Sequence, residues 1–237
     1  MVRWLERESK ERHERTENNY VLLGMSSPSG LINVFEPGLI RGSARLNHQP
    51  HKKYFYVEHP VEGWRVYLRM ACFIHEADSN DPRRFLVVKR KDATPSSNAW
   101  EPPKGQMEGK DAKPENAPLI ELMAENVRRE TFEEAKITKI KNLRYTGLVV
   151  QSREKEYPSN HYFQYHLFQA ITTSDEIEKA QETFKWLNEH PKAFSRMRSD
   201  VREKDALTWF DAKKTKMMGK WSPSILALYL AEGSKDL

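Results

Sequence analysis

Residues 100–137 read WEPPKGQMEGKDAKPENAPLIELMAENVRRETFEEAKI, and this stretch decides the fold. On a helix that turns by about 100° per residue, Glu133 and Glu134 lie roughly 60° and 40° to either side of Glu130. Three carboxylates therefore share one arc of one helix, where each like-charged pair costs roughly a few tenths of a kcal/mol. Hard divalent cations such as Mg²⁺ prefer oxygen ligands, so this arc predicts a metal site.

The same run resembles the signature of the Nudix hydrolase family, G-x5-E-x7-R-E-U-x-E-E-x-G-U, in which U is a bulky apolar residue. The positions that match it are Gly105, Glu121, Arg129-Glu130, Glu133-Glu134 and Ile137. A solvated, glutamate-rich helix is the alternative in a chain that is 31% charged. The spacing of Glu121 and the W-x-P-P-K-G at 100–105 argue against it.

Three positions depart from the signature. Glu121 follows Gly105 by 16 residues where the signature has six, so we expect a ten-residue insertion in the loop between them. Thr131 replaces an apolar residue, and Lys136 replaces the glycine that ends the helix. These two changes bear on helix packing and on the helix exit, and they leave the carboxylates in place.

The resemblance also implies roles for individual residues. It implies that Glu130, Glu133 and Glu134 bind Mg²⁺ or Mn²⁺, with the carbonyl of Gly105 as a further ligand. Glu130 and Glu133 are expected to act in catalysis as well. Arg129 belongs to the same catalytic group, because its guanidinium can orient carboxylates through bidentate hydrogen bonds.

Supporting residues are expected around this group. Glu121 is expected to support Arg129. In many Nudix enzymes the base or the last metal ligand comes from outside the signature, and Glu203 is our candidate for it. Glu154 and Glu156 are alternatives, and each of the three also fits an ordinary surface position.

The substrate is approached through the stretch at 100–105. Its W-x-P-P-K-G resembles the asymmetric dinucleoside tetraphosphate hydrolases, and decapping Nudix enzymes carry a related P-[KR]-G. Lys104 is expected to bind substrate, because its ammonium suits a chain of phosphates. Trp100 is a second candidate for substrate binding, although packing is the favoured interpretation.

The resemblance implies a metal-dependent pyrophosphohydrolase that acts on a polyphosphate-bearing nucleotide, either the 5′ cap of mRNA or a dinucleoside polyphosphate. One alternative is a diphosphoinositol polyphosphate phosphohydrolase. Another is a non-catalytic Nudix-fold module that binds RNA or a nucleotide. The complete acidic set argues against the module.

The predicted fold is α/β, a Nudix fold with a mixed β-sheet between helices, over 64–237. Before it we expect an N-terminal extension, 1–63, with a charged helix over 1–19 and an irregular or short-strand segment that could cover the cleft. Within this extension, cations at 41–53 run into the aromatic residues at 54–56. A helical and basic insertion is expected at about 174–204.

The expected elements follow from β-forming runs and helix-end signals. Strands are expected at 65–76, 84–90, 99–101, 143–152, 161–172 and 206–210. The first two strands should form a hairpin. The first helix of this fold is expected to start after Pro118 and end near Lys136, and the second to run from an N-cap at Ser174 to about Glu189, with Pro191 closing it. The last helix is expected to start at an N-cap at Ser222, with Gly233 past its end.

Composition sets further expectations for the 237-residue chain. The single cysteine, Cys72, excludes an internal disulfide and lies in an apolar run, where we expect a buried thiol. The N-terminus lacks the apolar core of a signal peptide, and no apolar run approaches the ~20 residues of a membrane span. We therefore expect a soluble, cytoplasmic protein without a membrane partner, and the resemblance leaves a homodimer open.

Net charge is +5, and it is concentrated in one segment. Residues 191–221 hold nine Lys and Arg against four Asp and Glu. Such a segment attracts polyanions, RNA or a small polyphosphate, and an ordinary solvated surface explains it equally well.

Overall fold

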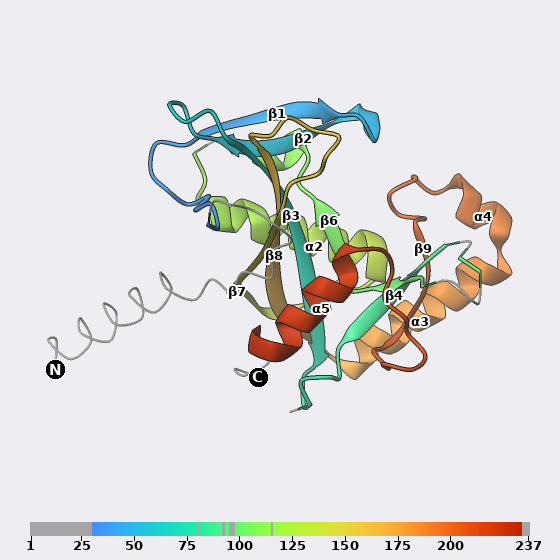
Figure 1. The fold of residues 1–237 in the computed structure, drawn as a ribbon. Helices are drawn as coiled ribbons and strands as arrows, with labels where there is room; N and C mark the ends of the chain where they lie inside the picture. Colours follow the sequence, from blue (N-terminus) through green and yellow to red (C-terminus); the bar gives the residue numbers. More distant parts are fainter. Residues whose placement is uncertain (1–29, 80, 92, 95–97, 115, 234–237) are drawn as a thin grey trace, which may run out of the picture.

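The computed structural model describes residues 30–79, 81–91, 93–94, 98–114 and 116–233. The helix expected at 1–19 lies outside them. The elements are β1 (Ile40–Leu46), β2 (Gln49–Glu58), β3 (Arg65–Glu76), β4 (Leu86–Arg90), β5 (Trp100–Glu101), β6 (Lys104–Gln106), the short 3₁₀-helix η1 (Gly109–Ala112), α2 (Leu119–Ala135), β7 (Lys141–Ser152), β8 (His161–Thr172), α3 (Ser174–Glu189), α4 (Pro191–Arg196), β9 (Lys204–Trp209) and α5 (Trp221–Glu232) (Figure 1).

A six-stranded mixed sheet forms the centre of the molecule (Figure 1). Its strand order is β1-β2-β3-β8-β7, and β6 pairs with β3 as well. Strands β3 and β8 run parallel over their whole length, from Arg65 opposite His161 to Glu76 opposite Thr172. The other pairs are antiparallel. The predicted α/β fold with a mixed sheet is therefore confirmed.

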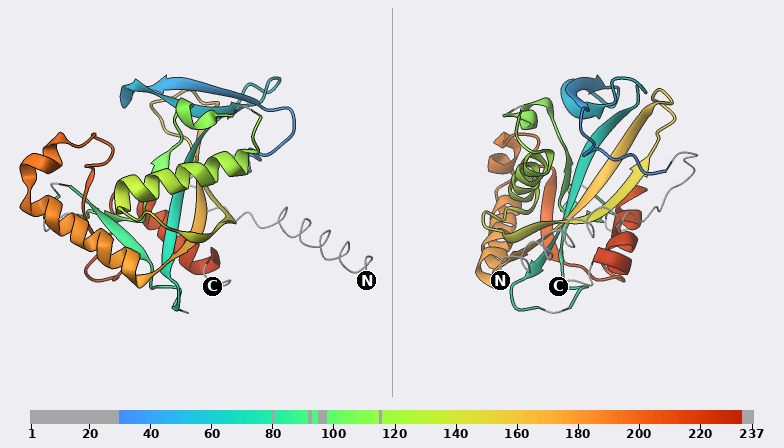
Figure 2. Two further views of the ribbon diagram at one scale, coloured as in Figure 1. Left: turned by 180° about the vertical axis from the view of Figure 1, so that it is seen from behind. Right: turned by 90° about the vertical axis from the view of Figure 1, so that its left-hand side faces the viewer.

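Helices cover both faces of this sheet: α2 and α3 lie on one side and α5 lies on the other (Figure 2). Side chains on a strand point alternately to the two faces. In β3, Leu68 and Met70 join the core under α2 and α3, whereas Ala71 and Phe73 join the core under α5. Both faces are apolar, which explains why the predicted strand at 65–76 is a nearly continuous apolar run.

Strand β4 belongs to a second sheet, in the order β5-β4-β9, so the predicted hairpin of 65–76 with 84–90 is wrong. Only a single bridge, His75 with Phe85, connects the two strands within the described chain. The edge of β3 opposite β8 already pairs with β2 near Tyr67 and with β6 near Met70. Strand β4 pairs instead with β9, from Leu86 opposite Trp209 onward.

The segment at 30–63 is more regular than the expected irregular or short-strand extension. Strand β2 has ten residues and pairs with β1 on one side and with β3 on the other, where Glu58 lies opposite Arg65. Glycine and proline interrupt the chain mainly outside the strands, at Pro37-Gly38 and Pro60. Between them Tyr54, Phe55 and Val57 are buried, so apolar burial stabilises a strand that the turn residues hide.

Helix α2 begins after Pro118 and ends before Lys136, as predicted. Lys136 itself adopts φ 60° and ψ 18°, the left-handed conformation that a glycine adopts at little cost. The substitution of the signature glycine therefore leaves the helix exit unchanged. Cys72 is buried as expected, and burial raises the pKa of its thiol.

Three helix ends differ from the prediction. Thr173, rather than Ser174, caps α3, and its side chain accepts a hydrogen bond from the backbone N–H of Glu176. Pro191 starts the short helix α4 and does not simply close α3, because proline fits the first turn of a helix. Helix α5 begins at Trp221, ahead of Ser222. Within the described residues, no helix has the length and apolar character needed to cross a membrane.

Candidate active site

The last two turns of α2 line a cleft of about 260 Å³. Glu133 and Glu134 are almost fully buried at its wall, and Glu130 is partly exposed beside them. Strand β6 supplies Lys104 and Gly105 to the same cleft. The helix and the strand thus bring together five of the signature residues, Gly105, Arg129, Glu130, Glu133 and Glu134. Lys104 and Glu203 also line the cleft, and Glu121 is not among its lining residues.

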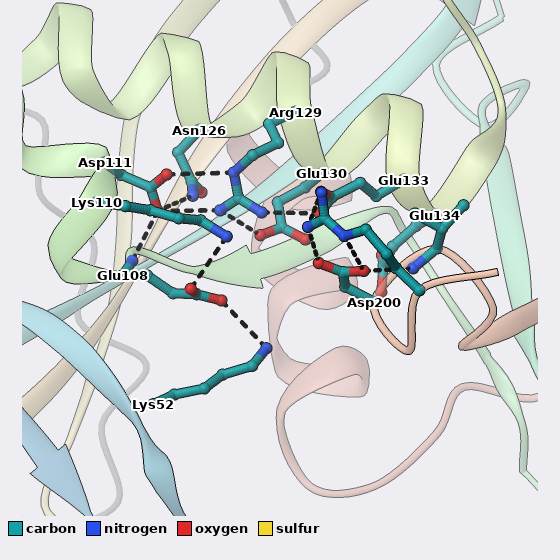
Figure 3. Close-up of polar contacts among 12 residues, drawn as sticks. Lys52, Glu108, Lys110, Asp111, Asn126, Arg129, Glu130, Glu133, Glu134 and Asp200 are labelled. Carbon is teal, nitrogen blue, oxygen red and sulfur yellow. Dashed lines mark hydrogen bonds and ion pairs between the residues drawn. The ribbon is translucent and has the colours of Figure 1, made fainter.

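Arg129 is bonded to three carboxylates (Figure 3). Its Nη1 donates to Glu133 Oε2 at 2.8 Å, and its Nη2 lies 2.9 Å from Glu130 Oε1. On the other side, Nε and Nη2 donate to Asp111 Oδ1 and Oδ2 at 3.2 and 3.0 Å. The planar guanidinium therefore fixes the orientation of two candidate metal-binding carboxylates, as expected for Arg129.

Asp111 occupies the place that was predicted for Glu121. Glu121 is exposed on the first turn of α2, whereas Asp111 in η1 binds Arg129 and accepts a hydrogen bond from Asn126 Nδ2 at 3.0 Å (Figure 3). Asp111 lies six residues after Gly105, the distance at which the signature has its first acid. The insertion therefore follows Asp111, and the spacing from Gly105 was the signal that could have identified this residue.

Gly105 is required by a close approach of the helix to the strand. A Cβ atom at Gly105 would lie 2.0 Å from the carboxyl carbon of Glu130. Any larger residue would displace this carboxylate from the cleft.

Burial and charge set the protonation of Glu130. Burial raises the pKa of Glu130 to about 8, against the opposing charge of Arg129 and with added repulsion from Glu134 and Glu133. A cation in the cleft would relieve this cost, because it favours the ionised carboxylates.

A buried network of two lysines and two glutamates adjoins the cleft, and no pattern in the sequence predicted it. Lys204 Nζ contacts the Glu101 carboxylate and lies 2.8 Å from Glu134 Oε1. Lys104 Nζ lies 3.0 Å from Glu101 Oε2, and the Lys104 backbone N–H donates to Glu134 Oε2 at 2.9 Å. Burial disfavours the charge on Lys204, but Glu134 and Glu101 outweigh it and raise its pKa, so the ammonium is retained.

Of the remaining candidate residues, one lines the cleft and the others do not. Glu203 is exposed and lines the cleft, whereas neither of its alternatives does. Glu154 pairs with Arg69 at 3.0 Å, and Glu156 is exposed in the turn between β7 and β8. Trp100 does not line the cleft either, because it packs against the core cluster under α5.

The wall opposite α2 comes from the hairpin of β1 and β2. His48, Lys52 and Tyr54 of this hairpin line the cleft together with Arg69 of β3. The imidazole of His48 is stacked on Tyr54, with ring centroids 5.4 Å apart. Part of the basic and aromatic run expected at 41–56 therefore faces the carboxylates.

The acidic residues of the cleft carry the kind of donor atom that a divalent cation binds. Glu130, Glu133 and Glu134 offer hard oxygen donors of the kind that Mg²⁺ and Mn²⁺ prefer. Within the described residues, no three acidic, histidine or cysteine side chains already surround a single point. Glu133 bonds to Arg129 and Glu134 bonds to Lys204. The donor chemistry therefore fits such a cation.

Comparisons with known proteins identify a family that this chain matches. A family model described as the NUDIX domain matches residues 69–210 of this chain. None of the curated proteins matches it. Among solved structures, a NUDIX hydrolase from Nitrosomonas europaea is 13% identical, with 70% of this chain and 88% of that chain covered and a TM-score of 0.39.

A second solved structure is an Ap4A hydrolase from C. elegans, in a binary complex. It is 17% identical, with 70% of this chain and 95% of that chain covered and a TM-score of 0.34.

Proposed function

This chain belongs to the Nudix family of hydrolases, and we propose that it cleaves a phosphoanhydride bond in a polyphosphate-bearing nucleotide with the help of Mg²⁺ or Mn²⁺. One observation carries this proposal: Glu130, Glu133 and Glu134 line a single cleft in which Arg129 orients two of them. A solvated helix surface would leave such carboxylates apart from one another and in water.

Each residue of the cleft has its own role in the proposed reaction. Glu130, Glu133 and Glu134 would hold the divalent ion, with the Gly105 carbonyl and Glu203 as further candidates. A bound ion supplies charge to polarise the phosphate and to make water more acidic. Arg129 keeps the carboxylates in register, and the fixed ammonium of Lys104 faces the negative charge that builds up on phosphate oxygens.

Two substrate classes lead this proposal, the 5′ cap of mRNA and dinucleoside polyphosphates. Cations of the cleft, such as Lys52 on the hairpin and Arg69 on β3, support a substrate with several phosphates. We also propose that Lys104 contacts the substrate. Binding of RNA and a homodimer are further parts of the proposal. Diphosphoinositol polyphosphate is the alternative substrate.

The test is phosphate-product release by the full chain with Mg²⁺, with Mn²⁺ and with EDTA. The substrates would be cap-labelled RNA, free cap dinucleotide, diadenosine tetraphosphate, ADP-ribose and diphosphoinositol polyphosphate. A Glu133→Gln variant keeps the shape of the side chain and removes its charge. The exposed Glu125→Gln on the same helix is the matched control.

We expect metal-dependent turnover that Glu133→Gln abolishes and Glu125→Gln preserves. Release of 7-methylguanosine diphosphate from long RNA, but not from free cap, would identify a decapping enzyme. A preference for the dinucleotide would identify a dinucleoside polyphosphate hydrolase. Absence of turnover with either metal would refute the proposal and favour a binding module.

A further inference from the structure

A second pocket, of about 570 Å³, adjoins the cleft of the carboxylates. Gln49, Lys104, Glu134 and Glu203 line both cavities, so the two are neighbouring parts of one groove. The second pocket lies where the ends of β4 and β5 meet the start of β9 and the loop that follows α4.

Three cations in this pocket lack an acidic partner. Arg90, Lys91 and Arg202 form no salt bridge within the part of the chain that the structure describes. The cations of the first cleft are different, because Lys52 pairs with Glu108 and Arg69 pairs with Glu154. Among the described residues that line the second pocket, five Lys and Arg stand against three Glu, so the pocket holds an excess of positive charge.

The framework positions the backbone of Arg90 and Lys91 and the side chains of Lys91 and Arg202. Arg90 lies opposite Lys204 in the pairing of β4 with β9, and the Lys91 backbone N–H donates to the Glu203 carbonyl at 2.8 Å. The Lys91 ammonium sits 4.4 Å from the ring centre of Phe194 in α4. Arg202 Nη1 donates to the Ser195 carbonyl at 2.9 Å, which leaves its remaining N–H groups available.

We propose that this second pocket is an anion subsite that binds the phosphates of an extended, linear polyphosphate beyond the anhydride that is cleaved. The acidic cleft would hold the metal and the scissile phosphates, and the chain of phosphates would continue past Lys104 towards Arg90, Lys91 and Arg202. This inference rests on the proposed function, and it narrows the substrate to one with a long phosphate chain.

The inserted segment supplies part of this subsite. Arg202 and Ser199 come from the loop between α4 and β9, within the segment expected to be an insertion. A guanidinium can bind phosphate through two parallel hydrogen bonds, whereas an ammonium acts as a point charge. The mixture of two arginines and one lysine is suited to a chain of phosphates and offers no aromatic surface for a base.

Binding is the first test, because it needs no turnover. Inorganic tripolyphosphate would be titrated into the full chain in EDTA and followed by calorimetry. The triple variant Arg90→Gln, Lys91→Gln and Arg202→Gln would be compared with wild type. A control triple variant, Lys185→Gln, Lys192→Gln and Arg196→Gln, removes the same charge from exposed positions on α3 and α4 outside both pockets.

We expect the pocket variant to bind tripolyphosphate at least about tenfold more weakly than wild type, since loss of one charged hydrogen bond to phosphate lowers the affinity by about that factor. The control variant should bind within about twofold of wild type, because long-range charge is screened by salt. Melting curves of both variants would establish that each is folded. Equal affinity of wild type and pocket variant, or no binding by wild type, would overturn the subsite.

Kinetics is the second test and separates this inference from the proposed function. With diadenosine tri-, tetra- and pentaphosphate, the pocket variant should lose kcat/KM progressively as the phosphate chain lengthens, mainly through KM. A loss that is equal for all three would overturn the subsite, as would an effect on capped RNA alone. If wild type binds tripolyphosphate through these cations but hydrolyses nothing, the proposed reaction fails and the subsite stands.

Discussion

Replacement of Lys204 by methionine should destabilise the protein strongly. The Lys204 side chain is 4% exposed, and its Nζ contacts the carboxylate of Glu101 and lies 2.8 Å from Glu134 Oε1. Methionine fills nearly the same space without the charge. Glu101 would keep Lys104 as a partner at 3.0 Å, whereas Glu134 would keep only the backbone N–H of Lys104.

The magnitude follows from the burial of this network. Removal of one partner from a buried ion pair costs about 3–5 kcal/mol, because it leaves an uncompensated charge in the interior. For a protein of this size, each kcal/mol lowers Tm by about 2–4 °C. We therefore expect Lys204→Met to melt roughly 6–20 °C below wild type.

The loss should depend on pH. Burial already raises the pKa of Glu134, and removal of the Lys204 ammonium raises it further. A carboxyl group with a raised pKa in the folded state is tolerated while it is protonated and destabilises the fold as pH rises. Lys204→Met should therefore be closer to wild type at pH 5 than at pH 8.

Thermal melts and urea titrations at both pH values, in EDTA, would measure these differences. Lys213→Met, at an exposed position after β9, is the matched control. A shift of less than about 2 °C at both pH values would refute the view that Lys204 neutralises buried carboxylates.

Three further predictions concern single residues. Asp111→Asn should lower kcat by about 10–100-fold in an assay with Mg²⁺, because Arg129 then loses the charge of one of its three carboxylate partners. Glu121→Gln should leave kcat unchanged, because Glu121 is exposed. Thr131→Val should raise Tm by about 2–4 °C in a calorimetric scan, because the buried Thr131 hydroxyl has no hydrogen-bond partner among the described residues. Burial lowers the pKa of His75 from 6.5 to about 4, so His75→Gln should weaken the loss of stability seen in urea titrations as pH falls from 6.5 towards 4.

Each of these has an outcome that contradicts it. Equal losses in Asp111→Asn and Glu121→Gln would return the supporting role to the helix. A lower Tm for Thr131→Val would mean that its hydroxyl is satisfied in solution. An unchanged pH slope in His75→Gln would remove the buried imidazole as a cause of acid sensitivity.

The carboxylate group was predictable from the sequence because helix geometry fixes it. Once Glu130, Glu133 and Glu134 stand on one helix, their shared arc follows from 3.6 residues per turn. Gly105 was identified by the signature and Lys104 by the W-x-P-P-K-G stretch at 100–105, and both residues line the cleft. The strand at 65–76 was clear because its apolar residues serve both faces of the sheet.

Other parts depend on contacts that no local pattern records. Asp111 was missed because Glu121 fits the spacing to Arg129, while Asp111 fits the spacing to Gly105, and only packing decides between them. Lys204 reads as one cation among many in a basic segment, and its burial follows from the pairing of β4 with β9. The partner of β4 was likewise hidden, because it lies more than a hundred residues away in the chain.

The position of Lys136 connects the departure from the signature with the inserted segment. A non-glycine residue in the left-handed conformation costs roughly 1–2 kcal/mol, and Lys136 adopts it at φ 60°. Its ammonium donates to the carbonyl oxygens of Glu133 and Val201, and hydrogen bonds from a charged donor are worth about 1.5–3 kcal/mol each. Glycine would remove the strain and also the tie between α2 and the loop that carries Arg202 and Glu203. Lys136 therefore joins the end of α2 to the inserted loop, so that the helix and the loop hold each other in place.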